Sequence, residues 1–265
     1  MKSLLLATLL LPLAVHAGCS RPIDVPLAAL GQTVNVQGAD ISGIYPDILR
    51  TISVRSGCQF RFRGVSRAQQ QALFETGKAD LLAPALRTPQ RDRYGSFVPM
   101  MQLRPMLVTV DPRHPPVTSL AQLRDATSLR LAVMRGFDFG DAFQAFIRDM
   151  QRAGRTEPVD DIVSAARLIQ SGYVDGIIMP PVAIASSVQN EPRISALQGR
   201  LRLHALAELP WTDNGVYLSR TTLSDADRRT LEQALAALAR TSSVWDNYRR
   251  YYPAEIVTES VRPLR

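Results

Sequence analysis

Lysine, histidine and cysteine are scarce in this chain of 265 residues. Of its 31 basic side chains only Lys2 and Lys78 are lysines, and it has three histidines and two cysteines. So small a supply of ligands excludes a histidine-rich metal site. The arginines are scattered and never form the basic cluster of about five to eight residues that tracks phosphates. The sequence therefore argues against nucleic-acid binding and predicts no metal site and no cofactor.

Long hydrophobic runs are also absent, except for Leu4–Val15 at the N-terminus. That run is well short of the roughly 20 residues that a membrane-spanning helix needs. Hydrophobic residues make up 46% of the chain and charged residues 21%, with a formal net charge of +7. This profile is typical of a folded globular protein. The length fits one ordinary domain or two small ones.

The N-terminus has the three parts of a secretory signal peptide. Met1-Lys2-Ser3 is a positive start, the apolar run follows, and Val15-His16-Ala17 supplies small residues for cleavage. We therefore expect residues 1–17 to be a signal peptide and the mature protein to be soluble and periplasmic. A lipoprotein stays an alternative because Cys19 follows closely, although His16 stands where a lipidation signal normally has leucine.

Cys19 and Cys58 both lie in the expected mature chain. An even pair in an oxidising compartment favours a disulfide over a metal site. The bond closes a loop of about 40 residues, for which chain entropy predicts roughly 3 to 4 kcal/mol of stabilisation. We therefore expect a structural staple and no redox centre. No G-x-S-x-G elbow accompanies a histidine, so the sequence gives no support to a Ser-His-Asp triad.

Strand-like and helix-like segments alternate along the chain, which predicts an α/β fold with largely parallel sheets. Apolar or alternating runs predict strands at 23–27, 59–63, 79–83, 129–133, 175–179 and 216–219, and an extended crossing segment at 97–110. Caps and apolar stripes predict helices from Pro46 to Gly57, from Ser66 to Glu75, from Thr88, across Phe143–Met150 to Gly154, from Asp160 or Asp161 to Gly172, from Ser224 through Leu238, and around Trp245–Tyr252. The proline-rich stretch Asp111–Pro116 predicts a lobe boundary nearby.

Several motifs, taken in order, resemble one family. They are Gly43-Ile44-Tyr45-Pro46-Asp47-Ile48, Gly77-Lys78-Ala79-Asp80-Leu81, Thr88-Pro89-Gln90-Arg91 followed by Phe97-Val98-Pro99, Leu131-Ala132-Val133-Met134-Arg135-Gly136, and Gly172-Tyr173-Val174-Asp175-Gly176. In this order and spacing they are similar to landmarks of the bacterial solute-binding protein family 3, the periplasmic receptors, many for amino acids, that feed ABC importers. The resemblance covers nearly the whole mature chain. It depends on order and spacing, because each motif alone is weak.

The resemblance implies an α/β fold of two lobes that close like a clamshell, each a mostly parallel sheet flanked by helices. Lobe 1 is expected at residues 18–104 plus 213–265 and lobe 2 at 105–212, with hinge crossings near 103–106 and 210–214. The ligand is expected in the cleft between them. Helix N-termini that face such a cleft offer free N–H groups and partial positive charge, which suits an anion.

On lobe 1 the resemblance implies a ligand site around Arg91. This residue matches the arginine that grips the ligand carboxylate in amino-acid-binding members, and a guanidinium does so through two hydrogen bonds. Leu86, Arg87 and Thr88 belong to the same loop, although Thr88 also reads as a simple helix cap. Arg67 matches a pocket-lining position or is a surface charge, and Tyr45 either forms an aromatic wall or packs against the following proline.

On lobe 2 the resemblance implies a ligand-holding loop at Gly136, Phe137, Asp138 and Phe139, where two phenylalanines replace polar residues. Amino-acid receptors place an aspartate five residues beyond the position of Asp175, to pair with the ligand's ammonium group; this chain has Pro180 there. We therefore expect a ligand other than an ordinary α-amino acid, such as a small organic acid.

The expected function is that of a monomeric binding protein, not an enzyme. We expect it to capture a small anionic solute, an organic acid or an amino-acid-like molecule, by hinge closure and to deliver it to the membrane permease of an ABC importer. Two alternatives stay open. One is a secreted dehydratase-like enzyme on the same fold, for which Asp138 is the cleft acid. The other is a ligand-sensing protein whose closed form docks on a separate sensor.

Overall fold

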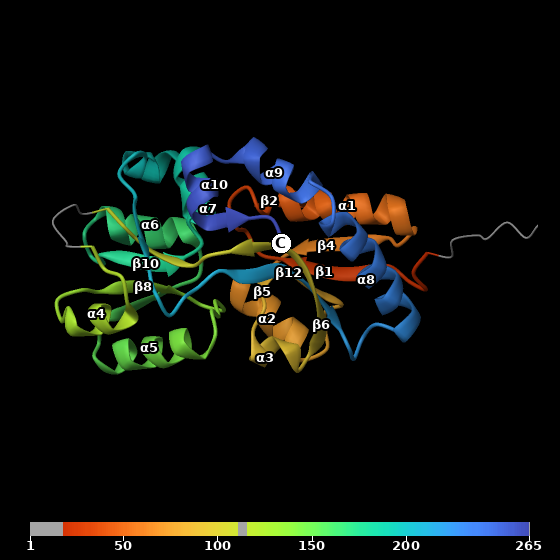
Figure 1. The fold of residues 1–265 in the computed structure, drawn as a ribbon, viewed down its shortest axis with the longest axis horizontal. Coiled ribbons are helices and arrows are strands. Elements are labelled where there is room, and N and C mark those ends of the chain that lie inside the picture. The colour runs from red at the N-terminus through yellow and green to blue at the C-terminus, as the bar shows by residue number, and fades with distance from the viewer. Residues whose placement is uncertain (1–17, 111–115, 265) are drawn as a thin grey trace, which may run out of the picture.

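The computed structural model describes residues 18–110 and 116–264. These residues form two lobes that lie side by side along the long axis of the molecule (Figure 1). We call first lobe the half that contains α1, α2, α3 and α8, and second lobe the half that contains α4, α5, α6 and α7. The expected signal peptide, most of the Asp111–Pro116 break and His114 lie outside the described residues.

The strands are β1 (Ile23–Leu27), β2 (Asn35–Gln37), β3 (Asp40–Ser42), β4 (Phe60–Gly64), β5 (Leu81–Leu86), β6 (Gly95–Leu103), β7 (Met106–Thr109), β8 (Leu131–Met134), β9 (Thr156–Val159), β10 (Gly176–Met179), β11 (Arg202–Ala205), β12 (Thr212–Ser219) and β13 (Val261–Arg262). The helices are α1 (Ile44–Ser56), α2 (Arg67–Glu75), α3 (Pro89–Asp92), α4 (Leu120–Asp125), α5 (Asp141–Arg152), α6 (Ile162–Gln170), α7 (Pro181–Asn190), the 3-10 helix η1 (Pro192–Leu197), α8 (Asp225–Ala239), α9 (Ser243–Tyr251) and α10 (Ala254–Ser260).

The first lobe is built on a sheet with the strand order β13-β6-β12-β5 and on the pair β1-β4. One apolar core lies between these strands and helices α1, α8 and α9, and a smaller cluster that includes Phe74 and Tyr217 lies on the α2 side. Strand β12 is central, because it pairs with β6 on one side and β5 on the other. The C-terminal part of the chain therefore completes a sheet that the N-terminal part begins.

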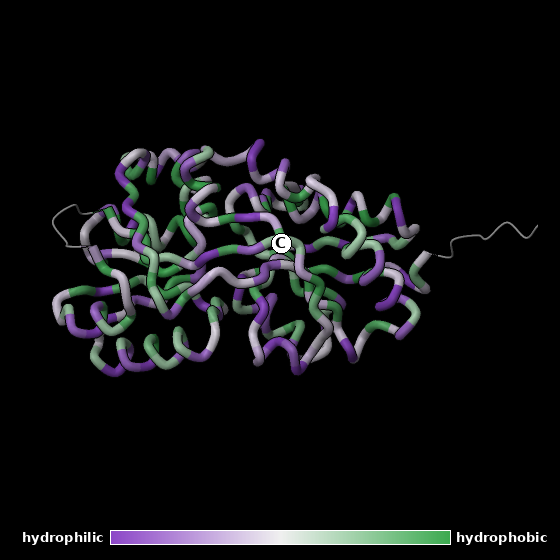
Figure 2. The backbone as a smooth tube through the Cα atoms, viewed as in Figure 1, coloured by the Kyte–Doolittle hydropathy of each residue, from purple (hydrophilic) through white to green (hydrophobic). Residues whose placement is uncertain are grey.

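The second lobe is built on a sheet with the order β11-β7-β10-β8-β9. Successive strand residues point to opposite faces. Accordingly, Leu107 packs with α4 and α5 whereas Val108 packs with α6 and α7, and Ile178 and Ile177 divide in the same way. Figure 2 shows that hydrophobic stretches concentrate along the inner strands and hydrophilic ones on outer turns. The lobe is a sheet covered by helices on both faces.

Three segments pass between the two lobes. Residues Leu103 and Met106 stand at the end of β6 and the start of β7, which belong to different sheets. The chain returns between β11 and β12. Near the C-terminus, α10 packs on α7 of the second lobe while β13 pairs with β6 of the first. The predicted extended segment 97–110 corresponds to most of β6 together with β7, and the chain passes from one sheet to the other between these two strands.

The α/β class and the two-lobed arrangement agree with the sequence expectation, but the sheets are less parallel than expected. The β1–β4, β8–β9 and β8–β10 pairs are parallel. All the ladders of β12, and those of β7, are antiparallel. In the first lobe, the reason is that the chain leaves the sheet after β6 and returns to it at β12, so these two neighbouring strands run in opposite directions. Apolar runs in the sequence indicate where the strands are. They do not indicate whether a neighbouring strand pairs in parallel or antiparallel.

Local signals place most helix ends correctly. Ser66 caps α2 with a full capping box, in which its side chain accepts from the Gln69 N–H and the Gln69 side chain accepts from the Ser66 N–H. Gly57 ends α1 with a φ of 73°, a conformation that favours glycine. Helix α1 begins at Ile44, two residues before the predicted Pro46. A proline fits anywhere in the first turn, because the N–H groups there have no intrahelical partner.

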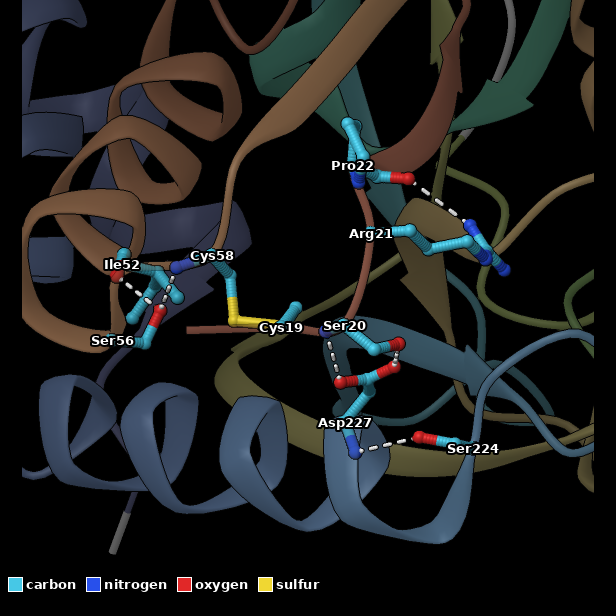
Figure 3. The surroundings of a disulfide bond; sticks show 9 residues. All are labelled: Cys19, Ser20, Arg21, Pro22, Ile52, Ser56, Cys58, Ser224 and Asp227. Atoms are coloured by element: carbon cyan, nitrogen blue, oxygen red, sulfur yellow. Dashed lines mark hydrogen bonds between the residues drawn. A yellow bond between two sulfur atoms is a disulfide. The ribbon is translucent and has the colours of Figure 1, made fainter. Parts of the chain in front are cut away.

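Cys19 and Cys58 form the predicted disulfide, with their Cα atoms 4.6 Å apart (Figure 3). Next to it, the N–H and hydroxyl of Ser20 donate to the carboxylate of Asp227 in α8, at 2.8 and 2.6 Å. The first described residues are thereby fixed to the segment that follows α1 and to α8. A lipid on Cys19 needs the same sulfur, so lipidation and this disulfide are mutually exclusive.

None of the helices in the two described ranges is long and apolar enough to cross a membrane.

We expect loss of the disulfide to destabilise the protein substantially. The double variant Cys19→Ser/Cys58→Ser frees a segment with a sequence separation of 39 residues in the unfolded chain. Chain entropy predicts a loss of about 3 to 4 kcal/mol in the free energy of unfolding. Urea unfolding of the oxidised wild type and the variant measures this. Reduced wild type is the control and should match the variant; a difference below about 1 kcal/mol from the oxidised protein contradicts the expectation.

The carboxylate of Asp80 holds two segments of the first lobe together through hydrogen bonds that depend on its negative charge. Burial alone raises the pKa of Asp80, but the two-pronged hydrogen bond from Arg21 and the bond from the Asp24 N–H outweigh it and lower the pKa. A lowered pKa contributes stability that is present above the unfolded value of about 3.9 and is lost as the pH falls through the folded value. Asp80→Asn should therefore have a lower free energy of unfolding than wild type at neutral pH. On acidification, its free energy of unfolding should fall by less than that of wild type. Denaturant titrations at neutral and acidic pH measure this, with Asp40→Asn, an exposed site, as the control. Parallel acid profiles for wild type and Asp80→Asn contradict it.

Candidate functional site

A cavity lies where the two lobes meet. It encloses about 480 Å³ between the atoms, including its opening to solvent. The first lobe supplies most of its wall, and the second lobe adds the loop before α5 and the start of α7. The lining residues are Leu30, Thr33, Arg67, Pro84, Leu86, Arg91, Leu103, Phe137, Asp138, Phe139, Pro180, Val182, Ala183 and Asn214.

Arg91 reaches the cavity from the short helix α3. Thr88 caps this helix by accepting from the Arg91 N–H at 3.3 Å, and Pro89 occupies its first turn. The Arg91 side chain is 1% exposed. Its Nε donates to Gln71 Oε1 at 3.1 Å and its Nη1 to the Leu86 carbonyl at 3.0 Å. Its Nη2 is buried and has no hydrogen-bond partner among the described residues.

Arg67 is the first residue of α2 and meets Arg91 at the cavity. Its Nη1 donates to Gln70 Oε1 at 2.5 Å and to the Pro84 carbonyl at 3.0 Å. The guanidinium also lies over the ring of Phe137, 5.8 Å from its centroid, so a cation–π contact joins the two lobes here. Its Nε is buried without a partner in the described part of the chain. Each arginine therefore keeps one unused N–H donor.

The charged side chains at the cavity are mainly cationic. Burial and the charge of Arg91 lower the pKa of Arg67 to about 9, and burial also lowers the pKa of Arg91. Asp138 is the acid among the lining residues. Its Oδ1 accepts from the Gly140 N–H at 2.9 Å and from Gln144 Nε2 at 3.2 Å, which ties it to its own loop. Among the described lining residues, two cationic side chains thus face one carboxylate.

The second-lobe loop closes against the first lobe. Phe139 contacts Phe137 and Phe143 edge to face and packs against the cores of both lobes. Gly136 has a φ of +81°, and a Cβ at this position lies 2.9 Å from the backbone of Ala68 in α2. Glycine is therefore required twice, for its conformation and for the close approach of the two backbones.

Six of the ten residues predicted for the ligand site line this cavity, namely Arg67, Leu86, Arg91, Phe137, Asp138 and Phe139. Tyr45, expected as a wall of the cleft, is fully buried behind the cavity and donates to Asn214 Oδ1 at 2.5 Å. Arg87 is exposed, pairs with Asp92 at 3.3 Å and lies outside the cavity. Thr88 and Gly136 line a neighbouring cavity that also opens between the lobes.

Other lining residues were missed by the sequence reasoning: Leu30, Thr33, Pro84, Leu103, Pro180, Val182, Ala183 and Asn214. Pro180 was noted only as the position where amino-acid receptors have an aspartate, and it does face the cavity. Asn214 carried a signal that could have been used, because a polar residue just before the apolar run Val216–Ser219 is out of place in a buried strand. Val182 and Ala183 belong to α7, which has no side-chain cap to announce it.

Among groups of three or more histidine, cysteine, aspartate or glutamate residues, none within the described ranges is placed to hold a metal ion.

Comparisons with known proteins are informative at the level of structure. No protein-family model and no curated protein matches the chain. Solved structures do. A protein assigned as an L-cystine ABC transporter from Listeria monocytogenes superposes with a TM-score of 0.70 and 14% identity, over 89% of this chain and 97% of that one.

Two further structures are similar over comparable lengths. The ancestral amino acid-binding protein AncCDT-1, a precursor of cyclohexadienyl dehydratase, gives a TM-score of 0.67 at 14% identity, over 88% of this chain and 96% of that one. A double mutant of the VFT2 domain of BvgS from Bordetella pertussis gives 0.64 at 19%, over 87% and 93%. At these identities the likeness shows the fold. The chain has the two-lobed fold of periplasmic amino-acid-binding proteins, in agreement with its resemblance to solute-binding protein family 3.

Proposed function

We propose that this protein is a periplasmic solute-binding protein that captures a small anionic solute between its lobes and delivers it to an ABC importer. One observation carries the proposal: Arg67 and Arg91 share a cavity, in which Arg91 is buried and Arg67 half-buried, and each has a buried N–H donor without a partner among the described residues. An unpaired buried donor is costly, and so is a buried cation without a counter-charge. A carboxylate supplies both the acceptors and the charge.

The ligand is an organic acid and not an ordinary α-amino acid. An α-ammonium group needs a carboxylate partner, and Pro180 stands where amino-acid receptors provide one. The remaining candidate is Asp138, whose Oδ1 is engaged by Gly140 and Gln144. Phe137 and Phe139 give the cavity an apolar wall that suits the carbon chain of a small acid.

Binding proceeds by closure of the two lobes, with the lobe boundaries at 104/105 and 212/213. Strand β6 ends at Leu103 and β7 begins at Met106 in the other sheet, which supports a hinge at the first boundary. The contacts that closure forms are between the Gly136 loop and α2, and between Gln32 and Ser186, where the Gln32 N–H donates to the Ser186 hydroxyl at 3.2 Å. A ligand that bridges the lobes favours the closed state by its differential affinity.

Two alternative functions are a ligand-sensing protein that docks on a sensor and an enzyme. The VFT2 domain comes from BvgS, and a similar closed form that docks on a sensor is compatible with this fold. An enzyme is suggested by the dehydratase precursor, but proton transfer needs an acid or base at the substrate, and Asp138 is the lining residue of that kind. Turnover of a candidate acid, followed by NMR over hours with the pure protein, favours the enzyme, whereas stable stoichiometric binding favours the receptor.

The role of Arg91 is tested by comparing it with a neighbouring arginine. A thermal-shift screen of small carboxylates first selects the acid that stabilises the protein most. Arg91→Ala should then weaken binding of that acid at least tenfold in isothermal titration, because charge-assisted hydrogen bonds contribute roughly 1.5 to 3 kcal/mol each. Arg87→Ala is the matched control, since Arg87 is exposed and lies outside the cavity. An unchanged dissociation constant for Arg91→Ala rejects the proposed anion site.

Closure is tested at two glycines. Gly136→Ala places a methyl group 2.9 Å from the backbone of α2, so the closed form becomes strained and the lobes should stay apart. Gly140→Ala is the matched control, because Gly140 also has a positive φ, of +94°, but open space around it. We expect a larger radius of gyration in solution scattering with saturating acid, and weaker binding, for Gly136→Ala alone. Equal behaviour of the two variants argues against closure at this loop.

A further inference from the structure

Asn214 is a buried polar residue in the cavity wall that the carboxylate site does not use. It lies on the central strand β12, is 3% exposed, and pairs in the β5–β12 ladder with Leu86. Directly paired residues of two strands present their side chains to the same face. Leu86 also lines the cavity, and its carbonyl accepts from Arg91. The Asn214 amide therefore stands beside the arginine end of the cavity.

Tyr45 fixes which end of this amide faces the cavity. The Tyr45 hydroxyl donates to Asn214 Oδ1 at 2.5 Å, and Tyr45 is fully buried. Burial raises the pKa of Tyr45, so its hydroxyl keeps its proton and acts as the donor. The amide oxygen is thereby occupied. The contact with Tyr45 is the side-chain hydrogen bond that Asn214 makes within the described residues, and it leaves Nδ2, a donor of two hydrogen bonds, for a ligand.

The cavity thus holds three sets of N–H groups and few free acceptors. The donors are Nε of Arg67 and Nη2 of Arg91, which are buried and have no partner among the described residues, and Nδ2 of Asn214, whose Oδ1 is engaged by Tyr45. The lining hydroxyl of Thr33 is paired with Tyr252 at 2.9 Å. One carboxylate has two oxygens, which the two arginines can take up in charge-assisted hydrogen bonds. The amide of Asn214 then needs an acceptor from a second group on the ligand.

We propose that Asn214, held in place by Tyr45, selects ligands that carry a second acceptor group, which are dicarboxylic or oxo-carboxylic acids, over simple monocarboxylic acids. This inference rests on the proposed function, because it assigns the ligand's second group within the same cavity. A site built to donate a hydrogen bond rejects the analogue that lacks the acceptor, since its buried donor is then left unpaired.

The test uses pairs of acids that differ only in the second carboxylate: malonate and propionate, succinate and butyrate, glutarate and valerate. Isothermal titration of the wild type should show at least one dicarboxylate binding at least tenfold tighter than its monocarboxylate partner. Asn214→Leu should bring that ratio close to one while the monocarboxylate still binds. Asn214→Asp keeps an oxygen for Tyr45 and replaces the donor with an anion, so it should weaken the dicarboxylate most.

Tyr45→Phe separates positioning from folding. It removes the hydrogen bond to Oδ1 and retains the ring, so the ratio should fall partway with little change in melting temperature. A ratio that is unchanged in both Asn214→Leu and Asn214→Asp overturns the inference and leaves the anion site intact, as does a wild type that does not discriminate within any pair. Binding that Arg91→Ala leaves unchanged, or no binding of any of the six acids, overturns the proposed function and this inference with it.

Discussion

The burial of two guanidinium groups between the lobes is the constraint on which the rest of the site depends. Arg67 and Arg91 stand at the beginnings of α2 and α3, and hydrogen bonds to the backbone and to glutamine side chains hold them in place. Their mutual repulsion has no full counter-charge among the described lining residues. In the proposed function, enclosing an anion between the lobes supplies the missing counter-charge. In this proposal, the charge of the two arginines and the closure of the lobes therefore depend on each other.

The positions of the two arginines could be predicted from the sequence, because each lies next to a strong helix-capping signal. The capping box at Ser66 and the cap and proline at Thr88 and Pro89 define where two short helices begin. A side chain in the first turn of a helix has a restricted direction. Once the helix starts are known, the positions of both guanidinium groups follow to a useful approximation. The Cys19–Cys58 disulfide was accessible for another reason, because the chain offers one possible pairing.

The residues that form the rest of the cavity wall could not be predicted from the sequence, for a physical reason. Thr33, Asn214 and Val182 come from three distant parts of the chain. Their meeting is decided by strand pairing, and the antiparallel arrangement of β6 and β12 leaves no mark on local periodicity. Helix α7 is buried on nearly all sides and lacks a side-chain cap, so its pattern is a plain apolar run. Arg87 is the opposite case: it was predicted for the ligand site because it is close to Arg91 in the sequence, but its side chain is exposed to solvent.

The order of strands in the first lobe has a consequence for how the chain matures. The ribosome makes β5 and β6 early and β12 only after the whole second lobe, yet β12 is the strand that joins them. Until Thr212–Ser219 emerges, two apolar strands carry open edges, which are templates for pairing with other chains. Synthesis of this protein therefore includes an interval in which β5 and β6 are present without the strand that pairs with both of them.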